Sequence, residues 1–152
     1  MQFSQAGLEL LKQSEGFRNT TYLDSSGYPT ICYGHKLVHP ECYPQGITEA
    51  QASIILEWDV REAENAIERL VKVPLSQGQF DALVDFTFNL GSGTLAGSTL
   101  LRNLNAGQYD AAAHQLLRWD HAGDEEVSGL KARREAEFRL WSAEQSTSRA
   151  AA

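Results

Sequence analysis

Three side chains near the N-terminus have the types that acid–base hydrolysis of a glycosidic bond requires. Glu15 stands where a short helix should end, and the negative end of the helix dipole there favours the protonated carboxyl of a general acid. Asp24 and Thr30 end and begin two β-type runs that a hairpin would bring together. A glycosidase uses one carboxyl group to protonate the leaving oxygen and a second across the bond. The pattern favours glycoside hydrolysis, while glutamates at helix ends and aspartates in turns also occur without a catalytic role.

The motifs around these residues continue along the chain. The first segment contains Glu15-Gly16-Phe17-Arg18, Tyr22-Leu23-Asp24, Gly27-Tyr28-Pro29-Thr30-Ile31 and Tyr33-Gly34-His35. Further motifs are Ile47-Thr48, Trp58-Asp59-Val60, Phe88-Asn89-Leu90-Gly91, Gly97-Ser98-Thr99-Leu100-Leu101-Arg102, Gly129-Leu130 and Arg133-Arg134-Glu135-Ala136-Glu137. Together they resemble the phage-type lysozymes, the endolysins of glycoside hydrolase family 24. The resemblance covers essentially the whole chain.

The resemblance implies inverting hydrolysis of the β-1,4 bond between N-acetylmuramic acid and N-acetylglucosamine in bacterial peptidoglycan, with no cofactor or metal. It makes Glu15 the proton donor, while Asp24 and Thr30 hold the attacking water. An inverting enzyme keeps its two carboxyl groups about 6.5–9.5 Å apart to fit that water. Phe88 and Asn89 resemble the substrate-binding floor of the cleft, although Phe88 fits a plain core position equally well.

Other resemblances concern charged residues and a cysteine. His35 and Asp59 resemble a family pair, to which we assign a structural role. Arg133 and Arg134 also resemble family residues, but on an amphipathic helix they favour a solvated, ion-paired face. Cys32 replaces a small residue of the family. By strand alternation it shares a face with Thr30, so we expect it to crowd the cleft or to join a disulfide.

The spacing of apolar residues predicts an α+β fold. We expect helices over residues 4–14, 48–73, 76–90, 98–105, 109–119 and 129–141, and a hairpin of strands 20–23 and 30–33. Capping boxes at Thr48/Gln51 and Ser76/Gln79 begin the second and third helices. The expected architecture is one lysozyme-like domain, residues 1–152: an N-terminal helix (1–14), a catalytic hairpin lobe (15–47), a linking helix (48–73), a helical lobe (74–145) and a frayed tail (146–152).

Composition and charge argue against some classes of binding partner. The net charge of −7 disfavours nucleic acid, and no apolar run is long enough to span a membrane. Residues 48–90 carry eight acidic and three basic side chains, so we expect the acidic long helix to face away from a cleft that binds anionic peptidoglycan. Without a signal-like segment, we expect a monomer made in the host cytoplasm that reaches the periplasmic wall after holin-dependent release.

Alternatives remain open at this stage. Cys32, His35, His39 and Cys42 have a spacing that resembles zinc ligands, and Cys32 with Cys42 could instead form a disulfide. A lytic transglycosylase would cleave the same bond with only one acid, so Asp24 and Thr30 weigh against it. A wall-binding or virion structural domain without activity would have lost Glu15 or Asp24, and both are present.

Overall fold

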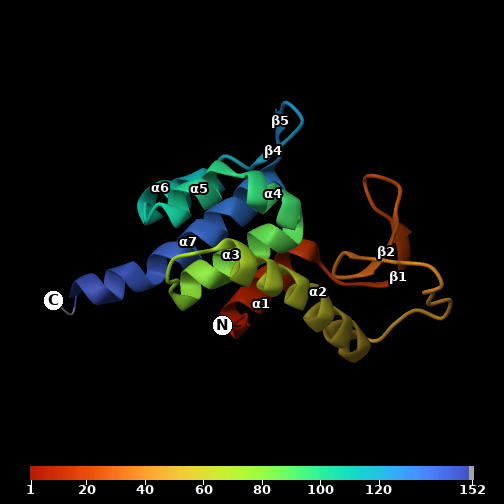
Figure 1. The fold of residues 1–152 in the computed structure, drawn as a ribbon. Coiled ribbons are helices and arrows are strands. Elements are labelled where there is room, and N and C mark those ends of the chain that lie inside the picture. Colours follow the sequence, from red (N-terminus) through yellow and green to blue (C-terminus); the bar gives the residue numbers. More distant parts are fainter. Residues whose placement is uncertain (151–152) are drawn as a thin grey trace.

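The computed structural model describes the backbone of residues 1–150 and the side chains of residues 1–143, and it confirms an α+β fold. A small sheet stands apart from a cluster of helices, and a long helix, α2, runs from beside the sheet into that cluster (Figure 1). No helix in the part of the chain that the structure describes has the length and apolar character needed to cross a bilayer.

The N-terminal helix and the sheet form as the local sequence predicts. Helix α1 (Gln5–Glu15) begins where the Ser4 side chain accepts a hydrogen bond from the Gly7 amide, and it ends at Gly16. Strands β1 (Arg18–Leu23) and β2 (Pro29–Cys32) pair antiparallel. A third strand, β3 (His35–Lys36), extends the sheet beside β2. It was not predicted because two residues are too short to show a period.

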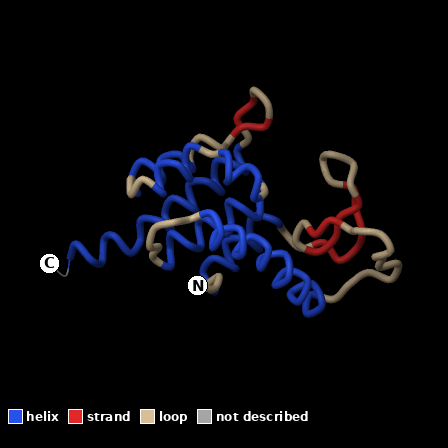
Figure 2. Tube along the Cα trace, in the orientation of Figure 1, coloured by secondary structure: helices blue, strands red, loops and turns tan. Residues whose placement is uncertain are grey.

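Both expected capping boxes are confirmed. Thr48 begins α2 (Glu49–Leu70), whose buried stripe includes Leu56, Val60 and Ile67. Ser76 begins α3 (Gln77–Leu90), which is buried continuously from Gly78 to Thr87. Helix α3 packs against α1, α2 and α7 and lies at the centre of the helical cluster (Figure 2). The core of the protein is therefore built around α3.

The remaining elements differ in part from expectation. They are α4 (Ser92–Gly97), α5 (Thr99–Asn105), α6 (Tyr109–Leu116), β4 (His121–Ala122), β5 (Glu125–Glu126) and α7 (Ser128–Ala150). Helix α4 was not predicted because no side chain caps its first turn. The β4–β5 hairpin was not predicted because each of its strands has only two residues. Helix α6 ends three residues early, and α7 continues past Trp141. In the expected tail, residues 146–150 have helical backbone, while residues 151–152 lie outside the described part.

Candidate active site

Glu15 is the last residue of α1 and lies against two other segments. Its Oε1 accepts a hydrogen bond from Nη1 of Arg133 in α7 at 2.6 Å, and its side chain is 20% exposed. Gly34, in the turn after β2, has φ of +80°, and a Cβ there would stand 3.0 Å from Oε2 of Glu15. A glycine at position 34 therefore gives the turn its left-handed backbone and leaves room for the carboxyl group.

Asp24 and Thr30 are held by the backbone of one residue between them, Tyr28. The Tyr28 carbonyl accepts from the Asp24 amide and from the Thr30 hydroxyl, both at 2.9 Å. The Tyr28 amide in turn donates to Oδ1 of Asp24 at 2.9 Å, and the Ser26 amide does so at 2.8 Å. Nζ of Lys36 lies 3.4 Å from Oδ2. The Tyr28 hydrogen bond, with those from Ser26 and Lys36, holds the pKa of Asp24 below its usual value.

Tyr22 lies within electrostatic range of both Glu15 and Asp24. It pairs with Thr30 across the β1–β2 ladder. Burial and the negative charges of Glu15 and Asp24 raise the pKa of the Tyr22 hydroxyl, against the opposing charge of Arg18. Glu15 and Asp24 therefore both act on the same side chain. Sequence reasoning named Tyr22 only as part of the Tyr22-Leu23-Asp24 motif and assigned it no role.

His35 lies between two carboxylates. Its Nδ1 is 2.8 Å from Oδ2 of Asp59 on α2, as the resemblance suggested, and its Nε2 is 3.1 Å from both oxygens of Glu41. The hydrogen bond to Asp59, reinforced by Glu41 and opposed by burial, raises the pKa of His35 to about 9. Sequence reasoning missed Glu41, which belongs to an irregular loop without any periodic pattern.

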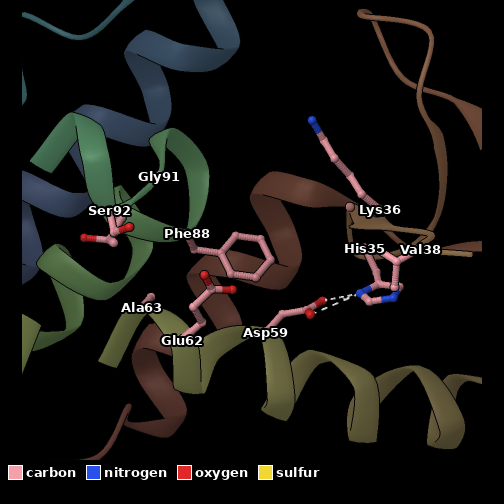
Figure 3. A pocket seen from close by; sticks show the side chains of 11 residues that line it. His35, Lys36, Val38, Asp59, Glu62, Ala63, Phe88, Gly91 and Ser92 are labelled. Carbon is pink, nitrogen blue, oxygen red and sulfur yellow. Dashed lines mark hydrogen bonds and ion pairs between the residues drawn. The ribbon is translucent and has the colours of Figure 1, made fainter. Parts of the chain in front are cut away.

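A cleft of about 360 Å³ is lined by residues of β3, α2 and the C-terminal end of α3, and Figure 3 shows its lining. Gly34, His35 and Lys36 belong to the lining. The Phe88 ring of α3 points toward the side of the cleft on which His35 and Lys36 lie (Figure 3). Glu15, Asp24 and Thr30 are not among the residues that line this cleft, and Thr30 is only 2% exposed. Two lining residues contact the carboxyl groups: Gly34 lies against Glu15, and Nζ of Lys36 lies 3.4 Å from Asp24. Unlike Phe88, Asn89 is bound to another side chain: its Oδ1 accepts a hydrogen bond from Nη2 of Arg134 at 2.8 Å.

The expectation that the acidic helix faces away from the cleft is wrong. Asp59 and Glu62, one turn apart on α2, both line the cleft, and Glu62 points toward Phe88 (Figure 3). The reason is geometric. Ala63 belongs to the apolar stripe of α2 that packs on the core, and it also lines the cleft. Asp59 and Glu62 lie at the edge of the same stripe, so their side chains face the cleft as well.

The expectation that Arg133 and Arg134 form a solvated face is also wrong, because they are 6% and 0% exposed. Arg133 binds Asp85 of α3 with two hydrogen bonds of 2.8 and 2.9 Å. Arg134 pairs with Glu137 at 2.9 Å and lies over the Phe86 ring. The apolar residues of α7 alone did not reveal this burial, since two arginines side by side normally mark a surface.

The two cysteines have free thiols. Cys42 is exposed, whereas Cys32 is buried and has φ of +60°, so regular strand alternation stops at this residue. Cys32 is not among the cleft-lining residues, against the expected crowding. Burial, with the charges of Asp59 and Glu41, raises the pKa of its thiol to about 11. Across the described residues no group of three or more histidine, cysteine or acidic side chains is arranged to hold a metal ion.

Comparison with known proteins assigns the family. Residues 12–137 match the family model described as phage lysozyme. The chain belongs to the phage lysozyme family. The endolysin of Salmonella phage P22 is 44% identical over 89% of this chain and 95% of its own length. The endolysin of Bacillus phage B103 is also 44% identical, over 93% of this chain, and the match spans only 54% of that relative.

Solved structures confirm the fold. A mutant of P22 lysozyme superposes with a TM-score of 0.82 at 42% identity, covering 93% of this chain and 98% of that one. The muramidase domain of SpmX from Asticaccaulis excentricus gives a TM-score of 0.85 at 34% identity, covering 92% and 97%. The lysozyme-like α+β architecture expected from the sequence is therefore confirmed.

Proposed function

We propose that this protein is an endolysin that hydrolyses the β-1,4 bond between N-acetylmuramic acid and N-acetylglucosamine in peptidoglycan, with inversion at the anomeric carbon. The observation that carries the proposal is the arrangement at the cleft. Glu15 lies against Gly34, which lines the cleft, and the backbone of Tyr28 holds Asp24 and Thr30 together in the β1–β2 hairpin. The relatives named as endolysins and the muramidase domain support the same substrate.

Glu15 is the general acid in this proposal and protonates the oxygen of the leaving sugar. Asp24 is the general base, because its hydrogen bonds keep it ionised and able to accept a proton from water. The Thr30 hydroxyl gives its hydrogen to Tyr28, so its oxygen lone pairs remain to accept a hydrogen bond from the same water. Phe88, which lines the cleft, packs under the sugar rings, and Asn89 is the second substrate-binding residue of the proposal. His35 and Asp59 support the lobe without touching the reacting atoms.

The first experiment replaces the acid. Glu15→Gln keeps nearly the same volume but has no acidic proton, and general acid catalysis contributes about 10²–10⁴-fold to rate. We expect the variant to clear a suspension of permeabilised Gram-negative cells at least about a hundredfold more slowly. Glu9→Gln is the matched control, since Glu9 is an exposed acid on the same helix. A Glu15→Gln variant with more than half of the wild-type rate would refute the assignment.

The products test the rest of the mechanism. NMR of the first-formed reducing ends should show the α-anomer, because water attacks from the face opposite the leaving group. The β-anomer would make Asp24 a nucleophile, and an anhydro sugar detected by mass spectrometry would indicate a transglycosylase. In the host we propose that lysis follows holin-dependent release of a monomer made in the cytoplasm. Cells expressing the protein should then stay intact until their inner membrane is permeabilised.

A further inference from the structure

A lysine in the cleft lies beside the two residues proposed to hold the attacking water. Lys36 of β3 lines the cleft, and its Nζ lies 3.4 Å from Oδ2 of Asp24. Lys36 is also the Cα partner of Thr30 in the β2–β3 ladder. Side chains directly opposite each other in an antiparallel pair lie on the same face of the sheet. Lys36 therefore brings a positive charge to the edge of the proposed reaction centre.

Two contacts favour one position of this charge. Oδ1 of Asp24 accepts hydrogen bonds from the amides of Ser26 and Tyr28, so the carboxylate is fixed with its Oδ2 beside Lys36. The Tyr28 ring centroid lies 4.8 Å from Nζ, a distance at which a cation is attracted to an aromatic face. A lysine side chain is otherwise flexible. Asp24 and Tyr28 therefore hold the ammonium group where the cleft can use it.

The Lys36 ammonium keeps the capacity to bind a second anion. It has three N–H donors, and the side chain is 60% exposed. Among the described residues that line the cleft, the other basic side chain is His35, which lies between the carboxylates of Asp59 and Glu41. Lys36 is therefore the positive charge of the cleft that an anionic ligand can reach.

We propose that Lys36 binds a carboxylate group of the glycan strand and makes the cleft selective for acidic over neutral sugars. The inference rests on the proposed function, in which the substrate contains N-acetylmuramic acid. The carboxyl group of this sugar is on its lactyl ether, and where a peptide is attached through that group the peptide supplies carboxylates instead. Glu62 of α2, which also lines the cleft, repels the same groups (Figure 3). Lys36 offsets this repulsion on the side of the cleft that carries Asp24.

The test measures binding of two ligands by NMR titration at low ionic strength. One is the disaccharide of N-acetylglucosamine and N-acetylmuramic acid, and the other is its carboxamide, which has nearly the same size and no charge. We expect Lys36→Met to weaken binding of the acid about two- to fivefold, the range of an exposed ion pair, and to leave binding of the amide unchanged. Lys36→Arg should retain the wild-type preference.

Lys131→Met is the matched control. Lys131 is also an exposed lysine that pairs with a carboxylate, that of Glu126 at 3.2 Å, but it does not line the cleft. This variant should bind both ligands as the wild type does. A third ligand, the disaccharide with its peptide, identifies the source of the carboxylate. Dependence on Lys36 with the acid assigns the sugar, and dependence only on free rather than amidated peptide carboxyl groups assigns the peptide.

Two results would overturn the proposal. Equal weakening of the acid and the amide by Lys36→Met would mean that the lysine only shapes the cleft, and unchanged binding of every ligand would leave it without a role in recognition. If the variant does not fold, the wild type still decides, because the Cε resonance of Lys36 should shift with a carboxylate ligand and stay in place with its amide. Binding is measured without turnover, so the result does not depend on whether the protein hydrolyses the glycan.

Discussion

At the scale of single residues, His35 joins the hairpin lobe to the long helix through ion pairs. β3 supplies the imidazole, α2 supplies Asp59, and the loop after β3 supplies Glu41. The pKa of His35, raised by Asp59 and Glu41 to about 9 from 6.5, exceeds its unfolded-state value. The stabilisation is therefore complete below pH 6.5 and is lost as the pH rises toward 9.

We predict that the free energy of unfolding falls by about 1–2 kcal/mol from pH 6.5 to pH 9. This is less than the whole pKa shift of His35 corresponds to, because solvent screens its partly exposed ion pairs. Asp59→Asn should remove most of this pH dependence. Urea unfolding at several pH values measures it. Glu57→Gln, on another face of α2, is the control and should behave as the wild type. An equal decline in Asp59→Asn and the wild type would mean that another group titrates.

At the scale of elements, α3 and α7 approach each other closely at Gly78. A Cβ placed there would stand 2.2 Å from the carbonyl oxygen of Leu140, which belongs to the backbone and cannot rotate away. Only glycine therefore fits where these two helices cross, because any Cβ would clash with the backbone of α7. Gly93 in α4 offers the opposite case, since nothing lies within 4 Å of its Cβ position.

We predict that Gly78→Ala destabilises the protein by about 1–3 kcal/mol, because the two helices must separate. Gly93→Ala should instead stabilise it by about 0.5–1 kcal/mol, since alanine loses less backbone freedom in a helix. Thermal and urea unfolding would measure both changes. If both variants lose stability equally, the close approach of α3 and α7 is not what determines the cost.

The elements also show what the sequence can predict. Capping boxes and apolar spacing identified both ends of α3 and the beginning of α2 to within one residue, because these signals are local, whereas α2 ends three residues before the expected position. Two-residue strands and the short α4 have no such signals. The same limit applies to the site. Glu15, Asp24 and Thr30 lie within one segment and were selected by their motif, whereas the partners Glu41, Asp85 and Glu137 depend on how distant helices and loops meet.

At the scale of the whole molecule, net charge opposes the proposed substrate. The chain carries −7, and Glu62 adds an exposed carboxylate to the cleft itself. Lys36 stands on the other side and interacts with Asp24 and the Tyr28 ring. An anionic glycan therefore meets a repulsive charge on α2 as it enters. Salt weakens such repulsion, since the screening length is about 10 Å at 0.1 M.

We predict that Glu62→Gln raises kcat/KM on peptidoglycan about two- to fivefold at low ionic strength, with the gain vanishing at about 0.5 M salt. The measurement is the clearing rate of wall suspensions across a salt series. Glu57→Gln removes the same charge on a face of α2 that does not line the cleft, and it should produce a smaller gain. A gain that persists at high salt would point to a change in packing.

The ion pair between Glu15 and Arg133 joins residues 118 positions apart, on the first and the last of the described helices. During translation α1 leaves the ribosome early, and α7 follows only after every other described element. Contacts between such distant segments form late, because a large loop must close first. Until residue 133 has been synthesised, the proposed acid lacks the guanidinium that donates to it. A chain interrupted before α7 therefore lacks the contact between Arg133 and Glu15.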